Sequence, residues 1–155
     1  MKYKYKMLNY SIVLPAGSGK TTLSRKYEFF IDIDSLHTLD FREKLKIQYS
    51  KALKSGDWET YNKFECDWIL LKLHQFPENY ILLVHCSEKA KILNLEILGS
   101  FKPSYKTIQK VVEERGLERG KLTILNWKTT NDAIILETHE DIEKEILKCA
   151  NKIRI

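Results

Sequence analysis

The sequence predicts an α/β fold, in which helices pack on a parallel β-sheet. Short apolar runs of strand length alternate with longer amphipathic stretches, an order that is typical of βα units. With 155 residues, of which 43% are hydrophobic and 30% charged, the chain has the size and composition of one globular domain, residues 1–155. We find no internal repeat or linker that would divide it.

The predicted strands are five short apolar runs, at 10–14, 29–33, 80–85, 95–98 and 133–136. The third run is apolar almost throughout, as is typical of a central strand that is buried on both faces. His85, at its end, is expected to be a core residue, with the alternative that it faces the site. Gly99 is expected to end the fourth strand, because glycine is depleted in strands.

The predicted helices lie between these strands, at 21–26 and 38–53, from 57 onward, at 87–93, 104–115 and 117–128, and from 139 onward. The stretch 117–128 also fits a strand, but 133–136 makes the better last strand. In the helix that begins near 57, large apolar residues recur every three or four positions, which predicts that they face the core rather than a ligand: Trp58, Tyr61, Phe64, Trp68 and Leu71.

The turn after the first strand carries the most specific motif of the chain, LPAGSGKTT at 14–22. A strand, a turn of small residues and a following helix form the context in which such a motif binds phosphate. Backbone N–H groups of the turn point at phosphate oxygens, and the start of the helix adds partial positive charge. The motif predicts eight nucleotide-binding residues: Pro15, Ala16, Gly17, Ser18, Gly19, Lys20, Thr21 and Thr22.

This motif resembles the GLPGSGKST form of the small P-loop kinases, a group that includes nucleoside monophosphate kinases, shikimate-kinase-like enzymes and polynucleotide kinase domains. The segments FIDIDSL and TNDAIILETHEDIEKEI are similar to the second-strand end and the C-terminal elements of that group. The resemblance implies a three-layer P-loop fold with a five-stranded parallel sheet in the order 2-3-1-4-5. It places the site at the carboxyl ends of the strands, as is general for open α/β sheets.

The resemblance also implies the cofactors, which are ATP (or another NTP) and Mg²⁺. Lys20 is expected to reach the β- and γ-phosphates, and Thr21 to bind the metal together with Asp32. Asp34 is expected to activate an acceptor hydroxyl or to orient an acceptor phosphate, although an aspartate at this position could instead cap the next helix. Because Asp32 and Asp34 are two positions apart on a strand end, they are expected to point to the same side.

Two regions receive roles from the same resemblance. The helical insertion 38–76 corresponds to the acceptor region, where Arg42 would hold an acceptor phosphate. The segment 102–128 corresponds to a lid, with Arg115 and Arg119 closing over the migrating phosphoryl group and Gly99, Gly116 and Gly120 as hinges. The alternative for 102–128 is a rigid helical layer on one face of the sheet, and Arg42 fits a helix surface equally well.

Two positions depart from the pattern of this group. Leu14 stands where the motif has its first glycine, and the third strand ends in His85 and Cys86 without the carboxylate that often holds Mg²⁺. Other P-loop classes fit less well, because the segment Asn126 to Thr129 is not the Asn-Lys-x-Asp motif of a GTPase. The chain also lacks the length of a helicase and the signature sequence of an ABC-type ATPase.

Charge and cysteine content bear on partners and compartment. The net charge of +5 suits a polyanionic partner, either a nucleotide or a nucleic acid, but also an ordinary lysine-rich surface. The alternating Lys and Tyr residues at 1–6 fit contact with nucleic acid or a frayed tail. An odd number of widely spaced cysteines, Cys66, Cys86 and Cys149, indicates reduced thiols and therefore a cytoplasmic protein. Neither a membrane span nor a signal peptide is expected.

The leading hypothesis from the sequence is therefore an ATP-dependent phosphotransferase. Its acceptor is left open among a nucleotide, a polynucleotide and a small metabolite. The alternative is a nucleotide-binding or slow NTPase module of a larger nucleic-acid or viral assembly.

Overall fold

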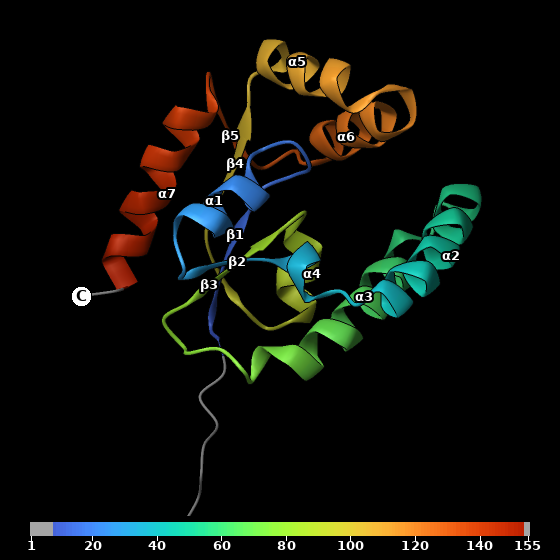
Figure 1. Ribbon diagram of the computed structural model, residues 1–155, viewed down its shortest axis with the longest axis horizontal. Helices are drawn as coiled ribbons and strands as arrows, with labels where there is room; N and C mark the ends of the chain where they lie inside the picture. The colour runs from blue at the N-terminus through green and yellow to red at the C-terminus, as the bar shows by residue number, and fades with distance from the viewer. Residues whose placement is uncertain (1–7, 154–155) are drawn as a thin grey trace, which may run out of the picture.

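The computed structural model describes residues 8–153, which form an α/β fold around one five-stranded sheet (Figure 1). The strands are β1 (Tyr10–Val13), β2 (Phe30–Asp32), β3 (Ile81–Val84), β4 (Glu96–Pro103) and β5 (Ile134–Leu136). All neighbouring strands are parallel, and their order β2-β3-β1-β4-β5 confirms the predicted order. The residues 1–6 that were considered for nucleic-acid contact lie outside the described part.

The helices lie on both faces of the sheet and beyond its carboxyl edge (Figure 1). They are α1 (Lys20–Lys26), the 3₁₀ helix η1 (Ile33–Leu36), α2 (Leu39–Ser55), α3 (Trp58–Leu73), α4 (Ser87–Ile92), α5 (Tyr105–Arg115), α6 (Leu117–Thr129) and α7 (His139–Ile153). The stretch 117–128 is therefore a helix, as preferred from the sequence. Within residues 8–153, no helix combines the length and the apolar character that crossing a membrane requires.

Side chains of the central strands alternate between two hydrophobic clusters, one on each face of the sheet. In β3, Leu82 and Val84 join α3 and α4 in the first cluster, whereas Ile81 and Leu83 join α1 and α7 in the second. This alternation follows from the period of two along a strand. It buries β3 completely and makes it a central strand, as its composition predicts.

The fourth strand is longer than predicted, because it continues through Gly99 to Pro103. Its register with β1 skips one residue, since Ser11 is opposite Ile97 and Ile12 is opposite Gly99. A bulge of this kind often contains glycine. A Cβ atom at Gly99 would lie 2.6 Å from the ring of Phe101, so the glycine accommodates a close contact inside the strand and does not end it.

The predicted core stripe of the third helix is also partly wrong. The face of α3 that is buried carries Asn62, Glu65, Cys66, Ile69 and Leu73. Of the large apolar residues that were expected there, Trp68 is half-buried against Phe41, with ring centroids 4.6 Å apart, while Leu71 is 64% exposed. The spacing of the apolar residues predicted the wrong face of α3, because the polar residues Asn62 and Glu65 occupy part of the face that is buried.

Candidate functional site

The segment Pro15 to Gly19, which we call the glycine loop, joins the carboxyl end of β1 to α1. Gly17 and Gly19 have φ angles of +86° and +101°, a backbone conformation that residues other than glycine rarely adopt. The Ser18 N–H donates to the Pro15 carbonyl at 3.1 Å and closes the turn. The Ser18 hydroxyl is buried and has no hydrogen-bond partner in the described residues, so the loop offers an unused polar group.

Lys20 begins α1 and is buried, with only 6% of its surface exposed. Its ammonium donates one hydrogen bond, to the Leu14 carbonyl at 3.2 Å. Burial lowers the pKa of Lys20, although the carboxylates of Asp34 and Asp32 oppose this shift. The residue is thus a buried cation held between the glycine loop and two acidic groups, with hydrogen-bonding capacity to spare.

Thr21 and Asp32, the predicted metal pair, are in direct contact. The Thr21 hydroxyl donates to Asp32 Oδ2 at 3.0 Å, and the other carboxylate oxygen accepts the Asp34 N–H at 3.1 Å. Asp32 is 4% exposed, whereas Thr21 and Thr22 are exposed. One hydroxyl and one carboxylate suit Mg²⁺, which keeps several of its waters in protein sites. The residues therefore fit the implied metal.

The sequence predicted that Asp32 and Asp34 point to the same side of a strand end, and this prediction is wrong. The strand ends at Asp32, and Asp34 lies in η1, where the chain has turned. Asp32, not Asp34, caps this helix through the Asp34 N–H. The two carboxylates therefore face different partners, Thr21 for Asp32 and His85 for Asp34.

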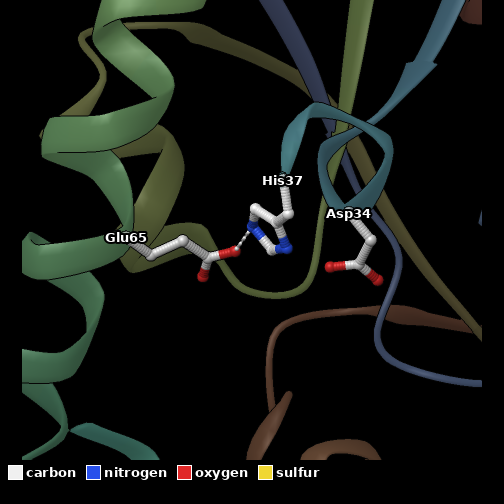
Figure 2. A group of neighbouring side chains, drawn as sticks. All are labelled: Asp34, His37 and Glu65. Atoms are coloured by element: carbon white, nitrogen blue, oxygen red, sulfur yellow. Dashed lines mark hydrogen bonds and ion pairs between the residues drawn. The ribbon is translucent and has the colours of Figure 1, made fainter. Parts of the chain in front are cut away.

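A hydrogen-bonded chain of ionisable side chains runs from Asp34 into the molecule. His85 Nε2 lies 3.2 Å from Asp34 Oδ2, and the Lys89 ammonium lies 3.0 Å from His85 Nδ1. Because an ammonium only donates, Nδ1 accepts and Nε2 carries the proton that is donated to Asp34. Lys89 also pairs with Glu65 at 2.5 Å, and the Glu65 carboxylate accepts a hydrogen bond from His37 Nε2 at 2.8 Å (Figure 2).

Figure 2 shows that His37 lies between Asp34 and Glu65, and the ligand atoms of these three residues lie within 4.8 Å of one another. This spacing would suit a metal ion. However, the buried Lys89 ammonium already neutralises Glu65, with side-chain exposures of 5% and 1%. A cation at this position would face that ammonium at close range, so we assign the cluster to the hydrogen-bonded chain and not to a metal.

Burial and charge shift the pKa values along this chain. Burial alone would raise the pKa of Asp34, but His85 and the ammonium groups of Lys20 and Lys89 outweigh it and hold that pKa well below its ordinary value. Burial lowers the pKa of His85, and the two lysines add to the effect. Asp34 is consequently an anion at neutral pH and a weak base, beside a neutral histidine.

The buried Glu65 makes stability dependent on pH. Burial raises its pKa, but Lys89 and the bond to His37 lower it to about 2, from an ordinary value of 4.5. A carboxyl whose pKa is depressed in the folded state stabilises the fold above its unfolded pKa. We therefore expect the free energy of unfolding to fall as pH decreases from about 4.5 to about 2. Urea unfolding across this range should show a smaller decrease for Glu65→Gln than for the unmodified protein.

Helices α5 and α6 pack directly on the glycine loop. Asn126 of α6 accepts the Ala16 N–H at 2.6 Å and donates to the His85 carbonyl at 3.3 Å. A Cβ atom at Gly17 would lie 2.6 Å from Ile108 of α5, and His139 contacts the Gly17 carbonyl at 2.7 Å. Sequence reasoning missed Asn126 and His139, because their contacts join segments that are more than 100 residues apart.

The arginines predicted to bind phosphate groups, Arg42, Arg115 and Arg119, differ in burial and in their contacts. Arg115 Nη1 donates to the Thr123 hydroxyl at 3.1 Å, and burial and the neighbouring Arg119 lower the pKa of Arg115. Arg42 is exposed and donates to the Asp34 carbonyl at 3.2 Å. Three glycines were considered as hinges. Gly99 lies within β4, and Gly120 lies within α6, where it packs against Val112 of α5. Of the three, only Gly116 joins two elements, α5 and α6.

A cavity of about 740 Å³ opens beside the glycine loop. Its walls come from the loop at Ala16, from α2 and α3, from His85 directly after β3, from Lys89 of α4, and from α6 and the end of α5. Arg115 and Arg119 both line it, but Arg42 does not. His85 therefore lines the cavity, which agrees with the alternative that it faces the candidate site, and Trp58 and Tyr61 line the cavity as well.

We compared the chain with models of known protein families and with curated protein sequences, and found no match in either comparison.

Proposed function

We propose that this protein is an NTP-dependent phosphotransferase that uses Mg²⁺ and transfers the γ-phosphoryl group of ATP. One observation carries the proposal: a cavity large enough for a second substrate adjoins the glycine loop at Ala16 and is lined by Arg115 and Arg119. A donor on the loop and an acceptor in the cavity would bring the two reacting groups together. Positioning of this kind accounts for most of the catalysis of phosphoryl transfer.

Each residue of the site has a role in this proposal. Lys20 and the N–H groups of the glycine loop bind the β- and γ-phosphates, and Ser18 supplies its free hydroxyl. Thr21 and Asp32 hold Mg²⁺, which neutralises charge on the phosphates. Asp34 stays ionised and orients Lys20 and the acceptor. Arg115 and Arg119 approach the transferred group from the other side of the cavity.

A screen with γ-labelled ATP tests the proposal. The label should move to at least one acceptor from a panel of nucleotides, oligonucleotides and phosphorylated or hydroxylated metabolites. Label that moves only to water with every acceptor would overturn the kinase assignment. That outcome would favour the slow NTPase, which the absence of a carboxylate at the end of β3 supports. The variant Asp34→Asn distinguishes the kinase from the slow NTPase in a second way. Only the kinase should lose turnover in this variant while it keeps its affinity for ATP.

The contacts of α5 and α6 with the glycine loop predict a change on nucleotide binding. The Ala16 N–H, which a phosphate would use, is held by Asn126. Bound nucleotide should displace this contact and reorganise the segment 102–128 as a lid. We expect amide hydrogen exchange in α5 and α6 to be faster than in the sheet without nucleotide, and to slow with a non-hydrolysable ATP analogue. Equal protection in both states would identify the segment as a rigid layer.

A further inference from the structure

The wall of the cavity formed by α2 and α3 carries three aromatic side chains. Tyr49, Trp58 and Tyr61 are mutually edge-to-face, with ring centroids 5.3 to 5.6 Å apart, and all three line the cavity. An aromatic surface that faces a cavity, and not the core, is available for stacking with a planar ligand. Every nucleobase has a planar aromatic face and can stack on such side chains.

Asn62, one residue beyond Tyr61, supplies the polar group of this wall. It lines the cavity and is 8% exposed, yet its amide makes no hydrogen bond to any residue of the range 8–153. The amide atoms are not among the buried polar atoms without a partner in the described residues, so they open onto the cavity, where a ligand can pair with them. An asparagine amide both donates and accepts, which matches the edge of a nucleobase. Asn126, on the opposite wall, has both functions already satisfied.

The opposite wall of the cavity is cationic. Arg115 and Arg119 lie there, and neither forms an ion pair with an acidic side chain in the part of the chain that the structure describes. Arginine binds phosphate through two parallel hydrogen bonds. An aromatic and amide wall on one side and two arginines on the other would suit a ligand with a base at one end and a phosphate at the other.

We propose that the acceptor is a nucleoside 5′-monophosphate, whose base contacts Tyr49, Trp58, Tyr61 and Asn62 and whose phosphate lies near Arg115 and Arg119. This inference rests on the proposed phosphotransferase function and specifies its substrate. The cavity volume of about 740 Å³ lies within the range of small-molecule sites. Sugars and other small metabolites would leave the aromatic wall and the Asn62 amide unused.

The chemistry of the site agrees with a phosphate acceptor. An acceptor phosphate with a second pKa near 6 is already ionised at neutral pH, so its oxygen attacks without a general base. A bond forms between that oxygen and the γ-phosphorus, and the bond to the β,γ-bridging oxygen breaks. The electron pair stays on the β-phosphate, and the products are a nucleoside diphosphate and ADP. Asp34, a weak base, need not accept a proton in this step.

Tryptophan fluorescence gives a binding test that does not depend on turnover. We would titrate the protein, without ATP, with AMP, GMP, CMP, UMP and dTMP, and with ribose 5-phosphate and a 5′-hydroxyl oligonucleotide as comparisons. At least one monophosphate should bind and quench the emission. Trp58→Phe should remove most of the quenching while the Kd stays within about threefold, because Phe also stacks. Trp68→Phe is the matched control and should keep the quenching, since Trp68 packs on Phe41 and bonds to Leu36.

Calorimetry on Asn62→Ala completes the test, with thermal unfolding to verify the fold. The Kd for the preferred monophosphate should rise by about tenfold or more, and the preference among bases should weaken. Equal binding of ribose 5-phosphate, binding of the oligonucleotide alone, or quenching that survives in Trp58→Phe would overturn the inference. Monophosphate binding without any label transfer would instead preserve the site and contradict the proposed function. Transfer of label to another acceptor without monophosphate binding would preserve the proposed phosphotransferase function and contradict the nucleoside monophosphate site.

Discussion

Replacing Lys89 by methionine is expected to lower the free energy of unfolding by about 3–5 kcal/mol, the usual effect of breaking a buried ion pair. The Glu65 carboxylate would remain 1% exposed without the ammonium that lies 2.5 Å away. His85 Nδ1 would lose its donor as well. Methionine keeps the length of the lysine stem, so most of the loss arises from the unpaired charge and little from packing.

Urea unfolding at neutral pH measures this effect. Lys148→Met is the matched control, because Lys148 pairs with Glu145 at 3.1 Å with both side chains more exposed, at 71% and 39%. The control should change stability by less than about 1 kcal/mol, as is usual for surface pairs. A double variant, Glu65→Met with Lys89→Met, should recover much of the loss, since it removes both charges together. Equal effects of Lys89→Met and Lys148→Met would mean that the buried network contributes little.

Local patterns in the sequence account for much of the fold. Apolar runs located all the strands, and the signal is clearest for the central strands β1 and β3, because a strand with two buried faces has a composition unlike that of its neighbours. The strand order was implied by the resemblance and agrees with the observed order β2-β3-β1-β4-β5. Gly99 was misjudged because its effect depends on the neighbouring strand β1 and on the Phe101 ring, which no local pattern reveals.

The candidate site was less accessible to sequence reasoning. The glycine loop and the contact between Thr21 and Asp32 follow from a motif and from strand topology. The chain from Asp34 to Glu65 does not, because its members come from η1, from the residue that follows β3, from α4 and from α3, and meet only in three dimensions. One signal was present: Asn62 and Glu65 are spaced by three residues on the same helix face as Ile69, and polar residues on a buried face indicate a network or a site.

Replacing Lys20 by alanine is expected to have the largest effect on activity. If Lys20 binds the β- and γ-phosphates, its loss should reduce the rate of phosphoryl transfer by about 10²–10³-fold, as is found when one charge-stabilising donor is removed. ATP affinity in the presence of Mg²⁺ should fall as well, by roughly 1.5–3 kcal/mol, the value of a charge-assisted hydrogen bond. Lys26→Ala is the control, because Lys26 lies on the same helix but pairs with Glu143 at the surface.

The fold should survive this substitution, and the reason distinguishes a ligand-binding lysine from a structural one. Lys89 has a buried carboxylate at 2.5 Å, whereas the described contacts of Lys20 contain only one hydrogen bond, to the Leu14 carbonyl. Burial lowers the pKa of Lys20, which means that the folded protein holds this charge at a cost. Lys20→Ala should therefore unfold at nearly the same urea concentration as the unmodified protein while it binds ATP weakly. Unchanged ATP affinity by calorimetry would show that the glycine loop is not a nucleotide site, and a loss of stability as large as that of Lys89→Met would show that Lys20 is a structural residue.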